Sequence, residues 1–266
     1  MKKRSKLIIK LLIVASVVGA LVAIVVGGGA MEKKRAEEKA GEVASLELNV
    51  PSLATAVGSF AVDKNGAAIP LDKADESLTR VEFVMDLHCK GCQQVETGIS
   101  ETMKQMMQNG EAQFFFTPVS FMNQASNDDY SARAASTLIE VAETDPQNFF
   151  NYLTALYKNF PAEGSQYPRA GVSYDNLAQT AKSVGVSEEA ISKFKDQRFR
   201  LWAQKNAEVV EARSEIFPQG ISTPTVLLGG KLEQEDRGYV LQDYTKVLFQ
   251  DSDVDKTFRD SFADVR

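Results

Sequence analysis

Residues 81–110 decide the fold of this chain, and they read VEFVMDLHCKGCQQVETGISETMKQMMQNG. The first five residues, Val81 to Met85, are largely β-branched and apolar, which predicts a buried strand. From Cys89 to Gln108 apolar residues recur at helical spacing, as at Val95 and Ile99. Cys89 and Cys92 are the only cysteines of the chain. The pattern therefore places both at a strand-to-helix junction, in the first turn of the helix.

This position gives the cysteine pair a chemical asymmetry. The start of a helix favours an anion, because its first N–H groups are free and the helix dipole is positive there. We therefore expect the pKa of Cys89 to lie below the ordinary value of ~8.5. Lys90 adds a nearby positive charge that acts in the same direction. A strand, a CxxC and a helix in this order are typical of a thioredoxin-like redox site.

The length of 266 residues suits one domain, or one domain with an insertion. The formal net charge is −6, and five cations lie in residues 1–10. The rest has 25 Lys and Arg against 36 Asp and Glu, a net charge of −11, which argues against a nucleic-acid partner. Two cysteines cannot make a disulfide-stapled scaffold, and a chain of this size forms a core without one.

Residues 1–30 predict a membrane anchor. MKKRSK is basic, and the 20 uncharged residues from Leu11 to Ala30 can cross a ~30 Å hydrocarbon core as a helix. The basic start predicts an N-terminus inside and a body outside. The alternative is a cleaved signal peptide, with Gly28 and Ala30 small enough for the cleavage site. In both cases the body is exported, and we expect a single-pass protein of the cell membrane with an extracytoplasmic body.

The other segments are expected to alternate between strands and helices. Residues 58–71 predict a hairpin around the Asn65-Gly66 turn, and 112–122 predict the strand that follows the stop at Gly110. From 128 to 217 the pattern is helical. Helix starts are expected at Tyr130, after Thr144-Asp145-Pro146, at Ser173 and at Ser187, the last helix carrying Ile191 to Val209.

The C-terminal part is expected to return to strands. Thr225 to Leu228 predicts a strand, followed by a Gly229-Gly230 turn and a second strand. The spacing of Leu241, Tyr244, Val247 and Leu248 predicts a closing helix, and residues 252–266 predict one more.

With this order of elements the chain resembles the DsbA-like thiol–disulfide oxidoreductases, in particular the membrane-tethered extracytoplasmic members of bacteria without a periplasm of the usual kind. The matching stretches are VEFVMDLHCKGC, FFFTPVSFM, YSARAASTLIEVAE, FPAEG and GISTPTVLLGGK. The resemblance implies an α/β, thioredoxin-like fold with an inserted helical domain, preceded by an N-terminal transmembrane helix. The expected parts are a basic stub and anchor (1–30), a tether (31–57), a first thioredoxin-like part (58–127), the inserted helical domain (128–217) and a second thioredoxin-like part (218–266).

The resemblance also implies roles for individual residues. Cys89 would be the attacking or leaving thiol, exposed at the helix end, and Cys92 would resolve the mixed disulfide. Thr223-Pro224 matches the cis-proline loop of the family, which faces the CxxC. There the backbone of the residue before the proline pairs with a substrate peptide as in strand addition. Without the resemblance, Pro224 is better interpreted as a trans proline that starts a strand.

The sequence departs from the family pattern at the residues around the thiols. Lys90 and Gly91 stand between the cysteines, at positions that strongly influence the reduction potential in the family, so the potential does not carry over. Phe83 stands where thioredoxins place a buried acid that relays protons to the inner thiol. Glu82 is adjacent, but its side chain is expected on the opposite face of the strand.

Two further residues next to the motif have two interpretations each. Asp86 is the nearest substitute for the relay acid, and it is either a structural loop residue or a group that tunes the thiols. His88 is the only histidine. It either stabilises the thiolate as an imidazolium or is an exposed loop residue. The role of the Pro/Gly-rich loop at residues 159–171 stays open.

The predicted function is the introduction of disulfides into exported proteins, with a membrane redox partner and without a cofactor. Cys89, Cys92 and His88 supply three zinc ligands where a structural site has four, so no metal is expected. One alternative is a reductase or isomerase of the same fold. The other is a non-catalytic binding or holdase protein whose CxxC is a stabilising disulfide, although so short a bridge closes little chain.

Overall fold

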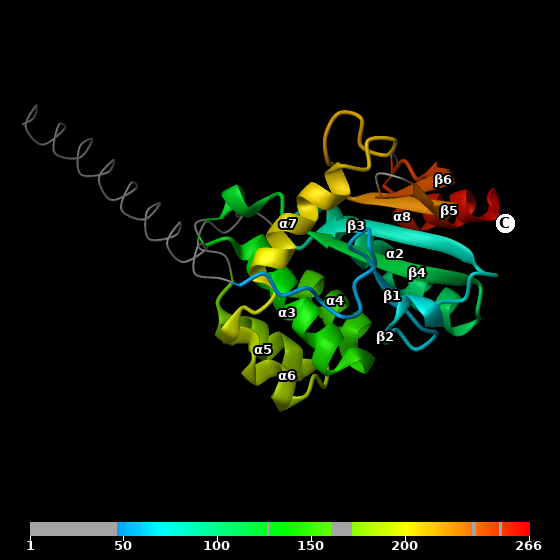
Figure 1. Cartoon of the computed structure of the whole chain (residues 1–266). Coiled ribbons are helices and arrows are strands. Elements are labelled where there is room, and N and C mark those ends of the chain that lie inside the picture. The colour runs from blue at the N-terminus through cyan, green and yellow to red at the C-terminus, as the bar shows by residue number, and fades with distance from the viewer. Residues whose placement is uncertain (1–46, 127, 161–171, 236–237, 250–251) are drawn as a thin grey trace, which may run out of the picture. The chain divides into compact units, whose positions relative to one another are not determined.

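The computed structural model describes residues 47–126, 128–160, 172–235, 238–249 and 252–266 (Figure 1). The predicted anchor at 1–30 and the first part of the predicted tether lie outside these ranges. None of the helices in the described ranges is both long and apolar enough to span a bilayer.

A six-stranded mixed sheet forms the centre of the fold, in the order β2-β1-β4-β3-β5-β6. The strand predicted at Val81 to Met85 is β3, Thr79–Asp86, and it pairs in parallel with β4, Ala112–Val119. The predicted hairpin is present as β1, Phe60–Val62, and β2, Ala68–Ile69. The α/β class expected from the sequence is thereby confirmed.

Helices cover both faces of this sheet because side chains alternate between the faces along each strand. Phe83 and Phe116 belong to the large core with α2, Lys90–Gln108, and α3, Tyr130–Thr144. Val84 and Leu227 point to the other face, where a smaller apolar cluster includes a residue of α7, Arg200–Glu211. The helix α2 connects β3 to β4, so the strand, the CxxC and the helix follow one another as predicted.

The chain between β4 and β5 is helical, as expected from the sequence (Figure 1). After α3 it forms α4, Phe149–Lys158, α5, Tyr174–Ser183, and α6, Glu188–Ser192. Ser173 and Ser187 cap α5 and α6 as predicted, each accepting a backbone N–H three residues on. The single helix predicted from Ser187 to Val209 is wrong. The chain turns at Gln197, whose φ is +53°, so that α6 ends early and α7 starts anew.

Two predictions at the C-terminal end are also wrong. β5 runs from Thr225 to Glu235 without a turn at Gly229-Gly230, and both glycines continue the strand with positive φ. The predicted closing helix is β6, Gly238–Lys246, which pairs antiparallel with β5. The last predicted helix is present as α8, Val254–Ala263.

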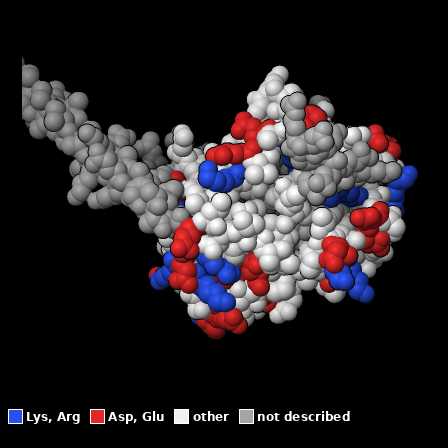
Figure 2. Space-filling model, viewed as in Figure 1, with Lys and Arg blue, Asp and Glu red and all other residues white. Residues whose placement is uncertain are grey.

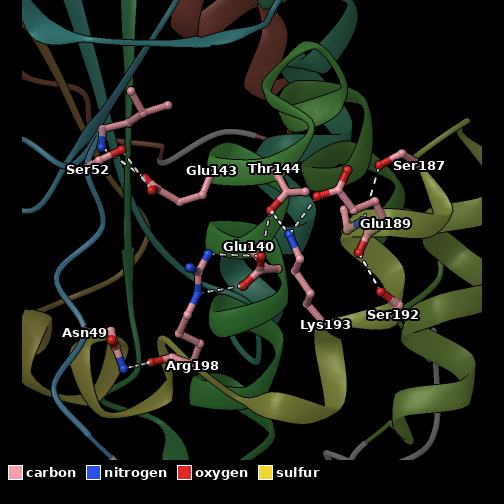
Figure 3. A network of polar contacts seen from close by, with 12 residues as sticks. Asn49, Ser52, Glu140, Glu143, Thr144, Ser187, Glu189, Ser192, Lys193 and Arg198 are labelled. Atoms are coloured by element: carbon pink, nitrogen blue, oxygen red, sulfur yellow. Dashed lines mark hydrogen bonds and ion pairs between the residues drawn. The ribbon is translucent and has the colours of Figure 1, made fainter.

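Residues 47–55, predicted as part of a tether, are held by side chains of the helical block (Figure 3). Glu143 accepts hydrogen bonds from the Ser52 hydroxyl at 2.8 Å and from the Leu53 N–H at 3.0 Å. The Asn49 amide donates to the Arg198 carbonyl at 3.2 Å. We call this segment, residues 47–55, the strap, because hydrogen bonds hold it against the folded body.

Charges are distributed unevenly over the molecule. Figure 2 shows one face with a broad uncharged middle and with acidic and basic side chains side by side at its margins. Glu82 belongs to a buried ion cluster: it is fully buried and contacts Arg213 at 2.6 Å and Arg80 at 3.1 Å. Glu82 thus lies among cations, which compensate the cost of burying its carboxylate.

Candidate dithiol site

The two cysteines occupy the first turn of α2. Cys89 is the N-cap residue with extended backbone, and Cys92 lies one turn further in. Both are free thiols. Cys89 was expected to be exposed, but its exposed fraction is only 8%, and that of Cys92 is 0%. Cys89 is therefore the sulfur nearer to solvent, although it is much more covered than predicted.

The two thiols have opposite electrostatic surroundings. The Cys92 thiol, as a hydrogen-bond donor, lowers the pKa of Cys89 to about 6 together with the N–H groups of the first turn. Burial raises the pKa of Cys92 well above its ordinary value, and the neighbouring Cys89 adds to this. Near neutral pH the stable state is consequently a Cys89 thiolate beside a protonated Cys92.

The loop that leads into β5, with Thr223 and Pro224, lies against the cysteines at the start of α2. The peptide bond between Thr223 and Pro224 is cis, as the resemblance implied. The Cys89 sulfur lies 3.5 Å from the Thr223 carbonyl oxygen, which accepts a hydrogen bond from it when Cys89 is protonated. Pairing of β3 with β5, with Val84 opposite Thr225, brings this loop to the helix start.

The residues between the cysteines leave room for that loop. A Cβ atom added to Gly91 would lie 3.0 Å from Pro224 Cδ and 3.7 Å from Cys89 Sγ. Glycine therefore lets the proline ring approach the helix closely. Lys90 is exposed.

Asp86 is the buried last residue of β3, and its carboxylate holds three segments together. It accepts hydrogen bonds from the His88 N–H, the Met122 N–H and the Ser131 hydroxyl. Burial raises the pKa of Asp86 to about 6. Because both carboxylate oxygens are engaged by donors, the structural interpretation of Asp86 fits these contacts better than the thiol-tuning one.

His88 is fully buried, so the exposed-loop interpretation is wrong. Its ring packs edge-on against Tyr130 and Phe160, at centroid distances of 5.4 and 5.7 Å. Burial lowers the pKa of His88, which disfavours the imidazolium form. The His88 ring is therefore part of the aromatic packing around Tyr130 and Phe160.

Three residues near the dithiol were not predicted from the sequence. Gln93 of α2 donates to the carbonyls of Tyr157 and Phe160, and the Tyr157 hydroxyl donates to the Asp86 carbonyl. Glu96 is fully buried one turn after Cys92. Its position in the apolar stripe between Cys92 and Ile99 was a signal for this, because a charged residue in such a stripe faces the core.

The remaining expectations concern a metal and a loop. Within the described ranges no group of three or more His, Cys, Asp or Glu side chains is arranged to hold a metal ion. Of the Pro/Gly-rich loop, residues 161–171 lie outside the described ranges.

Comparisons with known proteins give a family and a fold. A thioredoxin family model matches residues 74–240. No curated protein sequence matches the chain. MdbA, a thiol–disulfide oxidoreductase from Actinomyces oris, is a similar solved structure, with a TM-score of 0.60, 15% identity and coverage of 82% of this chain and 93% of the other.

Two further solved structures are similar over most of their length. Reduced DsbG, a disulfide bond oxidoreductase from Mycobacterium tuberculosis, has a TM-score of 0.56 at 17% identity, covering 80% of this chain and 89% of the other. Oxidised BdbD from Bacillus subtilis has a TM-score of 0.54 at 15% identity, covering 82% of this chain and 98% of the other. At these identities the likeness establishes a shared fold.

Proposed function

The chain belongs to the thioredoxin family and has a DsbA-like fold, and on that premise we propose that it is an extracytoplasmic thiol–disulfide oxidoreductase that introduces disulfides into exported proteins. The observation that carries the proposal is the unequal pair of thiols at a helix start. Cys89 is stabilised as a thiolate and Cys92 as a thiol, beneath a cis-proline loop. A merely stabilising disulfide has no use for this asymmetry.

The reaction begins with the oxidised form, in which a disulfide joins Cys89 and Cys92. A substrate thiolate attacks Cys89 Sγ, the intramolecular disulfide breaks, and Cys92 leaves with the electron pair. A second substrate thiolate then attacks the substrate sulfur of the mixed disulfide, and Cys89 leaves. The substrate has lost two electrons and gained a disulfide, while the protein holds the dithiol.

The electrostatics of the site favour this direction. A pKa of about 6 makes Cys89 a good leaving group and stabilises the reduced protein, so that the oxidised protein oxidises others. Ser222, Thr223 and Pro224 are at least partly exposed, which leaves the loop backbone accessible to an extended peptide. Substrate recognition is thus assigned to the loop and electron transfer to the cysteines.

The cellular setting is part of the proposal. The basic and apolar residues 1–30 support a membrane anchor with the catalytic body outside, where disulfides persist. A membrane protein that takes up the electrons completes the cycle. To test the location, intact cells are treated with a membrane-impermeant phosphine, which reduces the Cys89–Cys92 bond, and then with a membrane-impermeant thiol reagent. Cys89 is expected to be labelled without lysis, and labelling that requires lysis contradicts the location.

The direction of electron flow is tested by the reduction potential of the Cys89–Cys92 couple, measured against glutathione. The oxidase proposal expects a value much closer to the ~−120 mV of DsbA than to the ~−270 mV of thioredoxin. A value near the thioredoxin potential favours the reductase alternative. The Cys92→Ser variant has no such couple and serves as the blank.

Exchange itself is tested by trapping. In Cys92→Ala the Cys89 thiolate still forms mixed disulfides, but the partner thiol that resolves them is absent. We expect exported proteins to be captured through Cys89, and Cys89→Ala to capture none. Complete absence of captured partners contradicts the catalytic function and favours a non-catalytic protein.

A further inference from the structure

Glu96 is a buried carboxyl group whose bonding is incomplete. It is fully buried on α2, four residues after Cys92. Oε1 accepts a hydrogen bond from the Thr154 hydroxyl at 2.7 Å. Oε2 is buried and has no hydrogen-bond partner among the described residues. A buried carboxylate with one free oxygen is costly, so this group is stable only as an acid or next to a proton donor.

The helix geometry turns Glu96 towards Cys92. Residues four apart on a helix are neighbours, with about 5–6 Å between their Cβ atoms. A long helical side chain leans towards the N-terminus of its helix, over the residue one turn earlier. Cys92 and Glu96 are both buried residues of α2 one turn apart, so this geometry places the carboxyl group next to the sulfur that gains and loses a proton in each cycle.

Solvent reaches the neighbourhood of Glu96 from the other side. A cleft of about 320 Å³ lies between α2 and α4 and is lined by Thr154 and Lys158 as well as Ser100 and Glu101. Thr154 lines the cleft and also donates to Glu96. The carboxyl group is thus one hydrogen bond away from a residue that lines a water-accessible cleft.

The other buried groups near Cys92 are less suited than Glu96 to exchanging a proton with the Cys92 sulfur. Phe83 occupies the position of the relay acid and cannot carry a proton. Asp86 is engaged by three donors on its two oxygens. Burial keeps the pKa of Tyr157 well above its ordinary range, so it stays protonated. Glu96 is the remaining acid with a free oxygen.

We propose that Glu96 exchanges protons with the Cys92 sulfur and with the α2–α4 cleft, and so replaces the relay acid that Phe83 displaces. This inference rests on the proposed function. When a substrate thiolate breaks the Cys89–Cys92 bond, Cys92 leaves as a thiolate and takes the proton of the Glu96 carboxyl. The Glu96 carboxylate then takes a proton from water in the cleft. In reoxidation the Cys92 thiol gives its proton to the Glu96 carboxylate before its sulfur attacks.

The charges around Glu96 set the pH range of this exchange. Burial raises the pKa of Glu96 to about 7, while the Thr154 hydrogen bond and the Lys158 charge on α4 oppose the rise. Tyr157 on α4 interacts electrostatically with Glu96, with Asp86 on β3 and with the two cysteines. On α8, Asp255 and Arg259 contact α2 only further along, at Thr102. Glu96 therefore titrates near neutral pH.

Reduced full-length protein mixed rapidly with Ellman's reagent separates the two thiols. Cys89 attacks the reagent disulfide and releases one coloured thiolate. The Cys92 thiol then loses its proton and attacks Cys89 Sγ, which forms the Cys89–Cys92 bond and releases a second coloured thiolate. The first phase depends on reagent concentration and reports Cys89, whereas the second does not and reports Cys92. A first phase as slow as that of an ordinary thiol at pH 7 counts against the proposed function, independently of Glu96.

For Glu96→Gln we expect a second phase at least ~10-fold slower at pH 7, because general acid–base catalysis typically contributes ~10²–10⁴-fold. The first phase should be unchanged. Glu101→Gln, on the exposed rim of the same cleft, is the matched control and should leave both phases unchanged. Glu96→Asp keeps an acid and should retain the pH inflection of the second phase. A Glu96→Gln variant with wild-type rates and pH profile overturns the proposal.

Thr154→Val provides the second measurement, and it decides the question alone if Glu96→Gln does not fold by circular dichroism. Removing the hydroxyl removes a contact that lowers the pKa of Glu96. The inflection of the second phase should therefore move to higher pH, which a purely structural role of Glu96 does not produce. An inflection that stays in place overturns the proposal.

Discussion

The sharpest quantitative prediction concerns the thiolate of Cys89. Its pKa of about 6 compares with 9.0 for the unperturbed thiol. At pH 7 these values correspond to thiolate fractions of about 0.9 and about 0.01, close to a hundredfold difference. We expect the absorbance of the reduced protein at the thiolate band to rise with a midpoint near pH 6. Cys89→Ser should abolish this transition.

The same shift contributes to stability with a definite sign. The lowered pKa of Cys89 stabilises the folded reduced protein. This contribution is fully present above pH 9 and is lost as the pH falls through 6. At pH 7 it amounts to at most about 1.4 kcal/mol, since solvent at the helix end screens part of the interaction. For a two-electron couple, this free energy corresponds to a shift of about 30 mV in the reduction potential, in favour of the reduced form.

Cys92→Ala is the perturbation that tests the cause. It removes the thiol donor that contributes most to the lowered pKa of Cys89. The midpoint of the absorbance titration should move to higher pH, and alkylation by iodoacetamide at pH 7 should slow accordingly. A wild-type midpoint near 9, or a midpoint that Cys92→Ala leaves in place, would refute this reasoning.

Four further predictions concern the stability of the fold and the docking of residues 47–55. Arg213→Met leaves the Glu82 carboxylate with fewer donors and should lower the free energy of unfolding in denaturant by about 3 kcal/mol, and a loss below 1 kcal/mol contradicts the buried pair. The pKa of Glu82 is lowered from 4.5 to about 2, so the stabilisation that it contributes is present above pH 4.5 and lost towards pH 2. The free energy of unfolding should therefore fall more steeply over this range in the wild type than in Glu82→Gln. Parallel curves of stability against pH for the two proteins refute this. Gly58→Ala should lower the melting temperature more than Gly110→Ala does. Both glycines have positive φ, but only at Gly58 would an added Cβ meet a side-chain oxygen, Asn206 Oδ1, at 1.7 Å. Equal losses of melting temperature contradict this prediction. Glu143→Ala should free the strap and hasten proteolysis around residues 47–55, and an unchanged cleavage rate argues against docking.

The sequence was sufficient to predict an element wherever its local residue pattern and its capping residues indicated the same structure. The strand before Cys89, the helix after it and the serine caps of α5 and α6 each depend on residues close together in the chain. The cis bond at Pro224 followed from the resemblance, because nothing local to Thr223 distinguishes it from a trans proline. Periodicity and capping therefore predicted most of the architecture.

The errors lie where distant pairing decides the structure. The spacing of Leu241 and Tyr244 suits a helix, but their segment is the partner strand of β5. Gly229 and Gly230 resemble a turn, yet the pairing continues through them. Among the site residues, the burial of His88 and Glu96 depends on α3 and α4, which the sequence does not place against α2. Long-range packing overrode the local signal in each case.

The separation of the site into two distant stretches affects how the protein is made. Cys89 and Thr223 lie 134 residues apart in sequence, and the helical block lies between them. At about 5–20 residues per second, synthesis of that interval takes roughly 7–27 s. During this time the nascent chain carries both cysteines and lacks the loop that covers them. Such a growing chain is open to oxidation and to cross-linking with other chains, and this hazard ends when β5 joins β3.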